Sequence, residues 1–128
     1  MFLFGGQNFL DGNNEKLNDL WYMDLSGTSD KYHQWEKLKN NDVTATDNVQ
    51  KYAHSAVVYN NTLYIYGGKN ASDTPLSDLC TLNIQTINDA RNDSWTKLNT
   101  TGVVAAMAHH SADISGNIMY LFDNNKLY

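Results

Sequence analysis

The sequence contains a single cysteine, Cys80, so these 128 residues can form neither an internal disulfide nor a zinc site built from cysteines. Nine Lys and Arg residues against fourteen Asp and Glu give a net charge of −5, and the basic residues form no run. Nucleic acids and anionic membranes attract basic patches, so neither is an expected partner. The longest apolar stretches, such as residues 117–122, are far shorter than the roughly 20 residues of a membrane-spanning helix.

Helical patterns are also scarce. Proline occurs once, at Pro75, and no long segment repeats apolar residues with a period of 3.6. Short runs of β-branched and aromatic residues alternate with clusters of Asn, Asp, Gly and Ser, which favours an all-β fold. The expected strands cover residues 2–5, 18–25, 34–38, 54–59, 62–67, 77–84, 94–98, 110–114, 117–122 and 125–128.

Four segments recur in the same order with a period of about 60 residues. The matching pairs are Gly5-Gly6 with Gly67-Gly68, LNDLW at 17–21 with LSDLC at 76–80, WEKL at 35–38 with WTKL at 95–98, and HSAVVYNNTLYIY at 54–66 with HSADISGNIMYLF at 110–122. A unit of four short strands cannot bury both faces of its sheet alone. We therefore expect each unit to stack on a neighbour of the same kind.

The order of these segments resembles the kelch repeat: a His-Ser-Ala strand, an aromatic strand ending in Gly-Gly, an Asp-Leu-Trp-type strand and a strand with a lone Trp. The resemblance implies an all-β fold, a partial kelch-type β-propeller with four-stranded antiparallel blades. It places an incomplete blade without its first strand at 1–48, a complete blade at 49–100 and the start of a third at 101–128. The third unit departs from the pattern, because Asp123-Asn124 replaces the Gly pair.

Eight residues are interpreted as structural repeat positions, with no catalytic, cofactor or metal site among them: Gly5, Gly6, Trp35, His54, Gly67, Gly68, Trp95 and His110. The glycines belong to no phosphate-loop pattern, so we expect them to ease crowded strand ends. Both tryptophans should be superimposable and substantially buried between blades. Each repeated histidine should form a hydrogen bond that ties its strand to a neighbour. A phosphate loop, a stacking platform and a metal site are the less favoured alternatives.

Some conspicuous residues do not repeat. Trp21 has Cys80 as its counterpart, which makes Trp21 the better candidate for stacking on a ligand. Galactose oxidase shares the kelch-like propeller, but its copper-site motifs cannot be matched here, so Cys80 is expected to be buried filler. The adjacent residues His109-His110 should point to opposite faces of a strand and cannot readily bind one ion. Four N-x-[ST] sites begin at Asn60, Asn70, Asn92 and Asn99, but a sequence this rich in Asn yields such sites by chance.

The resemblance favours a protein-binding scaffold that is not an enzyme, needs no cofactor, and has a protein partner that the sequence does not identify. Inter-strand loops would bind that partner, namely 7–17, 26–33, 69–76 and 85–93. The alternatives are a fragment of a galactose oxidase-like propeller enzyme, such as a copper-radical oxidase or a sugar isomerase, and a truncated gene product without function. We expect a cytoplasmic location, and association with further blades or other copies instead of a stable monomer.

Overall fold

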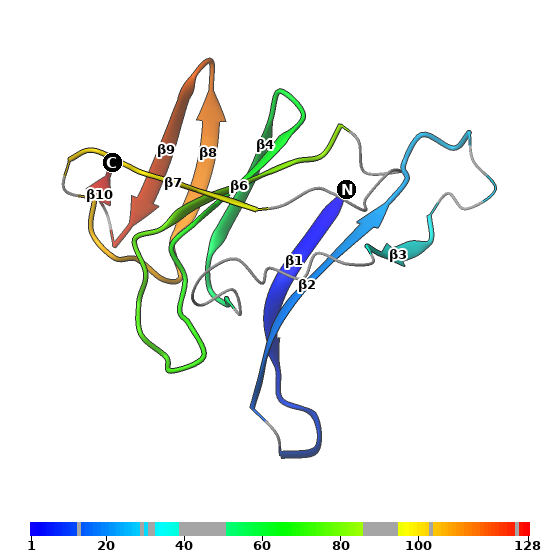
Figure 1. Ribbon diagram of the computed structural model, residues 1–128, viewed down its shortest axis with the longest axis horizontal. Helices are drawn as coiled ribbons and strands as arrows, with labels where there is room; N and C mark the ends of the chain where they lie inside the picture. Colours follow the sequence, from blue (N-terminus) through cyan, green and yellow to red (C-terminus); the bar gives the residue numbers. More distant parts are fainter. Residues whose placement is uncertain are drawn as a thin grey trace.

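The computed structural model describes residues 1–12, 14–28, 30, 33–38, 51–85, 95–102, 104–124 and 126–128. These residues form three antiparallel sheets (Figure 1). The first sheet contains β1 (Phe2–Asn8), β2 (Glu15–Met23) and β3 (Trp35–Lys37). The second sheet contains β4 (Ser55–Tyr59), β5 (Thr62–Tyr66), β6 (Leu79–Asn83) and β7 (Thr96–Leu98). The third sheet contains β8 (Ser111–Ser115), β9 (Ile118–Asp123) and β10 (Lys126–Leu127). In the described part of the chain, the only helical segment is the 3-10 turn η1 (Leu10–Gly12).

The all-β fold with one four-stranded sheet between two incomplete ones is confirmed. Each expected strand is present, with ends that differ by a few residues. The expected blade boundary at residue 49 lies outside the described residues, so the exact division of the chain stays a prediction.

Strand β1 extends beyond its expected range, because it continues past the Gly pair to Asn8. A register shift between Phe4 and Gly6 marks a bulge, after which Gly6 pairs with Leu17. The extra residue is on β2, where Asn18 and Asp19 stand opposite Gly5, and Gly5 has a φ of 59° at this irregularity. Much of the expected loop 7–17 is therefore the far end of the β1–β2 hairpin.

The tight turn between β4 and β5 explains why these two strands meet in register. Asn60 and Asn61 have φ values of 45° and 56°, the left-handed conformation that a two-residue hairpin turn requires. Asparagine tolerates this conformation better than other residues with a side chain. The pairing then runs without interruption from Tyr59 opposite Thr62 to Ser55 opposite Tyr66.

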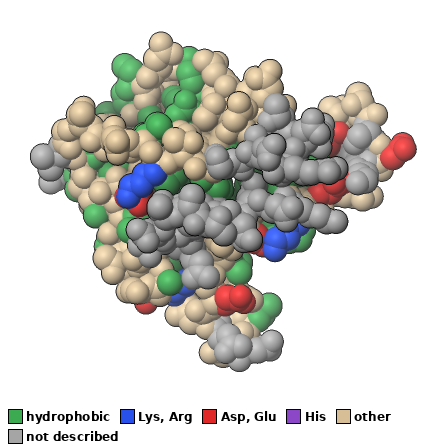
Figure 2. All heavy atoms as spheres, viewed as in Figure 1, with side chains coloured by type: hydrophobic (Ala, Val, Ile, Leu, Met, Phe, Trp, Pro, Cys, Tyr) green, Lys and Arg blue, Asp and Glu red, His purple; other side chains and the backbone are tan. Residues whose placement is uncertain are grey.

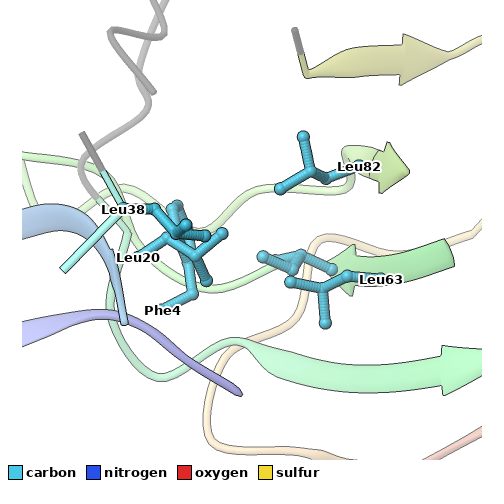
Figure 3. Close-up of a cluster of buried hydrophobic side chains, with 6 residues drawn as sticks. Phe4, Leu20, Leu38, Leu63 and Leu82 are labelled. Carbon is cyan, nitrogen blue, oxygen red and sulfur yellow. The ribbon is translucent and has the colours of Figure 1, made fainter. Parts of the chain in front are cut away.

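The first hydrophobic core lies between the first and second sheets. It is formed by Phe4, Leu20 and Leu38 from the first sheet and by Leu63, Ile65 and Leu82 from the second. Figure 3 shows the two groups facing each other. Leu63 and Ile65 are two residues apart on β5 and so share the face that points to the first sheet.

The second hydrophobic core lies between the second and third sheets. Tyr66 projects from the opposite face of β5 and is buried with Met107 and Leu121. The second sheet is therefore covered on both faces, as stacking of repeated units requires. The first and third sheets are each covered on one face by the described residues.

The innermost strands of the second and third sheets, β4 and β8, lie next to each other (Figure 1). In the first sheet the strand order begins with β1, which is the counterpart of β5 and not of β4. Within the described residues, the first sheet thus has no counterpart of β4 or β8. This matches the expected incomplete unit at the start of the chain.

Candidate functional site

Each histidine of the repeat packs on the sheet that precedes it. The rings of His54 and Phe4 meet edge-on at 5.5 Å, and those of His110 and Tyr66 do so at 5.6 Å. The adjacent glycines permit this approach. A Cβ atom on Gly67 would lie 2.6 Å from the Met107 carbonyl oxygen and 3.1 Å from the His110 ring. Gly5 occupies the equivalent place beside Lys51 and His54, so both glycines have a structural reason to lack a side chain.

Backbone hydrogen bonds repeat at the same junctions. Gly6 donates to the carbonyl of Lys51 at 2.9 Å, and Gly68 donates to that of Met107 at 2.7 Å. His109 donates from its backbone to Ala53 at 2.8 Å, and both of these residues have positive φ values. The segments that lead into β4 and β8 are thus anchored to the preceding sheet by main-chain contacts.

His110 bridges the two innermost strands. Its Nε2 atom lies 2.8 Å from Ser55 Oγ, and both side chains are buried. A Ser–His pair at this distance is the geometry of an activated nucleophile, but His110 Nδ1 has no hydrogen-bond partner that would orient the ring. Burial lowers the pKa of His110, which keeps the ring neutral. The pair is therefore a buried link between sheets.

The environment of His54 also favours the neutral ring. Burial is the main cause that lowers its pKa to about 4, and the positive charge of Lys51, together with that of His110 where it is protonated, adds to the effect. A histidine with this pKa carries no charge at neutral pH. His54 is suited to packing against Phe4 and not to proton transfer near pH 7.

The two repeated tryptophans have different surroundings. Trp95 packs against Phe4 with ring centroids 4.8 Å apart and joins the first core. Trp35 is 40% exposed, so the expectation of substantial burial is wrong for this residue. Trp35 pairs with Met23, on the face of the first sheet opposite to Leu20 and the core. No described sheet covers that face, whereas Trp95 has the first sheet as its neighbour.

The residues that do not repeat have polar neighbours. Trp21 donates its indole hydrogen to Asp19 at 2.7 Å, and the Lys37 ammonium lies 5.7 Å from the centre of the Trp21 ring. Cys80 is partly exposed, and its Sγ atom lies 3.6 Å from the buried Lys51 ammonium. The surroundings of Cys80 are therefore more polar than those of a cysteine that only fills space in a hydrophobic core.

A group of polar side chains gathers at one end of the sheets, and we call it the rim cluster: Lys16, Tyr52, Lys69 and Asp73. The Lys16 ammonium lies 3.0 Å from Asp73 Oδ1. Tyr52 donates to the same carboxylate oxygen at 2.6 Å, and its ring centre lies 4.5 Å from Lys16 Nζ and 5.9 Å from Lys69 Nζ. The cluster joins the β1–β2 hairpin, the segment before β4 and the β5–β6 loop.

Local hydrogen bonds position the members of the rim cluster. The side-chain oxygen of Asn70 accepts hydrogen bonds from the backbone of Ser72 at 2.9 Å and of Thr74 at 3.0 Å. These bonds shape the turn that presents Asp73. On the other side, Lys16 donates to Asn14, which also accepts from Gln7.

The charges in the rim cluster are defined at neutral pH. The hydrogen bond from Tyr52 and the interactions with Lys16 hold the pKa of Asp73 below its usual value. The same bond to Asp73 raises the pKa of Tyr52, so the phenol stays protonated. The cluster thus presents a carboxylate, a phenol and ammonium groups. These groups suit hydrogen bonding and ion pairing with a polar surface.

Sequence reasoning identified only part of this cluster. Lys16, Lys69 and Asp73 lie in loops that were expected to bind a partner, but Tyr52 was not singled out. Of the expected loop 85–93, only Gln85 is described, and Asn92 lies outside the described residues. Among the other N-x-[ST] positions, Asn60 and Asn99 are exposed and Asn70 is partly buried.

Neither a cluster of metal-binding side chains nor a membrane-spanning helix occurs in the described ranges. No three His, Cys, Asp or Glu side chains there are grouped to hold a metal ion. His109 is exposed and His110 is buried, so the adjacent pair does not converge. In the same ranges, no helix has the length and apolar character needed to cross a bilayer.

The comparisons with known proteins give one family. A family model described as the KLHDC2/KLHL20/DRC7 Kelch-repeats domain matches residues 1–123. No curated protein matches the chain significantly.

Proposed function

This chain belongs to the kelch-repeat family, and we propose that it binds a partner protein through the rim cluster and the loops beside it. Membership of this family supports a protein-interaction scaffold in general terms. The finer proposal, that this particular rim is the binding surface, rests on the rim cluster.

The observation that carries the proposal is the convergence of three chain segments on Asp73. Lys16 is buried and holds a carboxylate whose side chain is 58% exposed, so the anchor is rigid and the contact group faces solvent. Loops presented by a rigid scaffold are the usual place for recognition. The free lone pairs of Asp73 can accept hydrogen bonds from an Arg, Lys or backbone amide of a partner.

The composition of the rim cluster favours a protein surface as its ligand. Tyrosine is enriched at protein interfaces, where its ring supplies contact area and its hydroxyl group a directional bond. The rim cluster contains one carboxylate, which is paired with the Lys16 ammonium, and a second ammonium, that of Lys69, near the Tyr52 ring, and this mixture suits a partner surface of mixed charge. Among the described contacts, the only Ser–His pair is Ser55 with His110. Both side chains are buried, so a substrate could not reach them.

The test is affinity capture with the full chain as bait, comparing wild type with Asp73→Lys. Asp30→Lys is the matched control, because Asp30 is exposed in the connection after β2, at the opposite end of the first sheet. A partner should be captured by wild type and by Asp30→Lys but lost with Asp73→Lys. Its purified form should then bind wild type directly, with at least about tenfold weaker binding to Asp73→Lys.

The proposal is wrong if captured proteins bind Asp73→Lys as well as they bind wild type, or if both charge reversals weaken binding equally. Far-UV circular dichroism of each variant checks that the fold is kept. Because Asp73 is exposed, its replacement should leave that spectrum unchanged.

A further inference from the structure

Lys51 buries an ammonium group where the first and second sheets meet. Its side chain is 5% exposed, whereas Lys37 and Lys97, which pair with aspartates at the surface, are 55% and 57% exposed. Figure 2 shows basic side chains beside acidic ones on the visible surface. Burial of an ammonium group costs free energy unless polar partners compensate for the lost water. The place of Lys51 in the interior therefore needs an explanation.

The repeat does not provide that explanation. Lys51 and Met107 are counterparts, because their carbonyls accept the same backbone hydrogen bond from the two Gly pairs, at 2.9 Å and 2.7 Å. Met107 is buried in the second core, so an apolar side chain fills this position in the contact between the second and third sheets. A charged side chain in the same position is thus specific to the first contact and is not required by the fold.

The Lys51 ammonium group points at the sulfur of Cys80. The two atoms lie 3.6 Å apart, and in the described part of the chain this is the only hydrogen bond of that ammonium group. Asp78 Oδ2 lies 3.8 Å from it, too far for a hydrogen bond, and the other oxygen of Asp78 is bound to Lys97 at 2.8 Å. The buried nitrogen is therefore held against the thiol without a strong partner of its own.

We propose that Lys51 and Cys80 are a redox-dependent modification site, at which a peroxide brings about a covalent bond between Lys51 Nζ and Cys80 Sγ. Cys80 is partly exposed, so a small oxidant can reach its sulfur. The peroxide oxidises the thiol to a sulfenic acid and is itself reduced to water. The nitrogen then attacks the sulfur to form a sulfenamide. It gives up two protons, one to the leaving hydroxide, which departs as water, and one to solvent.

The geometry favours Lys51 as the nitrogen that reacts. Groups held about 3–3.5 Å apart react as an intramolecular pair, and the Nζ–Sγ distance of 3.6 Å is close to that range. Cys80 is the only cysteine, so no internal disulfide can compete. Lys97 lies opposite Cys80 on β7, but its ammonium group is bound to Asp78 and is largely exposed.

The bond would tie two neighbouring sheets together. Lys51 is anchored to the first sheet by backbone hydrogen bonds with Gly6 and Leu17, and Cys80 lies on β6 of the second sheet. The linked residues are 29 positions apart, so the bond restricts the unfolded chain and stabilises the folded one. The strength of the first sheet contact then depends on the oxidation state. The proposal does not depend on the rim cluster.

Intact-mass spectrometry of the full chain after treatment with hydrogen peroxide tests the bond. The expected result is the loss of two hydrogen atoms, about 2 Da, which dithiothreitol reverses. Tryptic mapping should find the peptides that contain Lys51 and Cys80 joined to each other. A gain of about 16, 32 or 48 Da without the joined peptides would mean that Cys80 only climbs the oxidation ladder, and would overturn the proposal. An unchanged mass or a disulfide between two chains would overturn it equally.

Two conservative variants identify the nitrogen. Lys51→Arg keeps the positive charge but removes the amine, so the loss of about 2 Da should disappear. Lys97→Arg is the matched control, because Lys97 belongs to the same cluster, and this variant should form the bond as wild type does. The opposite pattern, or equal loss of mass in both variants, would refute the assignment to Lys51. If Lys51→Arg does not fold by circular dichroism, the joined peptides of wild type decide the question.

Urea denaturation tests the consequence for the sheets. Oxidised wild type should unfold at a higher urea concentration than the reduced protein, and Lys51→Arg should show no such rise. An oxidised, linked chain that unfolds at the same urea concentration as the reduced one would contradict a tie between the two sheets.

Discussion

Strands β5 and β9 align residue by residue, yet they bury different side chains. In β5 both faces are covered, by Ile65 in the first core and Tyr66 in the second. In β9 the described residues cover only the face with Leu121, and Phe122 is exposed. Equivalent sequence positions are therefore interior or surface positions according to whether a sheet lies beside them. In a repeat fold, whether a residue is buried therefore depends on the contact between neighbouring units and not on the unit alone.

The Gly pairs give the same contrast at the level of the backbone. A Cβ atom on Gly68 would lie 2.7 Å from the Tyr52 carbonyl oxygen and 2.8 Å from His54 Cβ, whereas one on Gly6 would meet nothing within 4 Å. The difference arises because Gly68 lies beside the segment that leads into β4. Gly6 contacts that segment only through its amide, which donates to the Lys51 carbonyl, and in the described residues its own sheet has no strand equivalent to β4 on the side where a Cβ atom would point.

The largest difference should come from removing one aromatic ring at each of the two equivalent positions. Tyr66→Ala should lower the free energy of unfolding by about 4 kcal/mol, because it leaves a cavity in the second core and removes a hydrogen bond to Ala105. Phe122→Ala should cost less than about 1 kcal/mol in dilute protein. Urea denaturation of the two variants measures both values. Equal costs for the two variants in dilute protein would contradict the assignment of Phe122 to an open face.

The second effect concerns pH and the buried histidine. The pKa of His54 is about 4 in the folded chain and about 6.5 when unfolded, so the unfolded chain takes up the proton first as pH falls. Stability should therefore fall between pH 6.5 and 4, with His54 contributing about 3 kcal/mol of the loss. Urea midpoints across this range for wild type and His54→Gln measure that share.

His33→Gln provides the control for the pH series, because His33 is exposed. It should keep the pH dependence of wild type, whereas His54→Gln should flatten it. If both variants lose stability with acid as steeply as wild type, burial of His54 is not the cause.

The third effect compares the two glycines. Gly68→Ala should destabilise the chain by about 2 kcal/mol more than Gly6→Ala, since only the first forces a close contact with neighbouring backbone. Both positions have positive φ, at 85° and 113°, so the conformational strain of alanine is common to the two variants. Thermal unfolding followed by circular dichroism measures the difference, and equal melting temperatures would show that the close approach at Gly68 is not maintained in solution.

The smallest effect concerns the serines that follow the repeated histidines. Ser55→Ala should cost about 1 kcal/mol, because it removes the hydrogen bond to His110 and leaves a buried ring nitrogen without a partner. Ser111→Ala at the equivalent, exposed position should change the stability by only a few tenths of that. Urea denaturation with closely spaced points measures both, and a cost at Ser111 as large as at Ser55 would contradict the comparison.

The strands and the repeat could be predicted because both depend on local patterns. Aromatic and β-branched runs between Asn and Gly clusters mark β5 and β9. Asn60 and Asn61 form the tight turn between β4 and β5, because asparagine readily adopts the positive φ that such a turn needs. The continuation of β1 past Gly5 could not be predicted, because the equivalent Gly67 does not continue its strand. Whether a strand continues past its Gly pair depends on the strand with which it pairs, and the Gly pair itself does not indicate this.

The rim cluster shows the same limit. Lys16 and Asp73 are 57 positions apart, and nothing in either loop indicates that a hairpin of one sheet meets a loop of the next. Tyr52, which completes the cluster, precedes β4 and belongs to no expected loop. Contacts of this kind follow from the way the sheets stack, and the repeat period alone does not position them.

The sequence by itself determined the all-β class, the four recurring segments and the positions where side chains must be small, since these follow from strand alternation and turn chemistry. The tertiary structure alone decided which copy of each repeated residue is buried. Trp95 and Trp35 occupy the same position in their units, but within the described part of the chain only Trp95 has a neighbouring sheet to pack against. The reason is physical: removal of apolar surface from water requires a second surface, and a residue's own unit does not supply it.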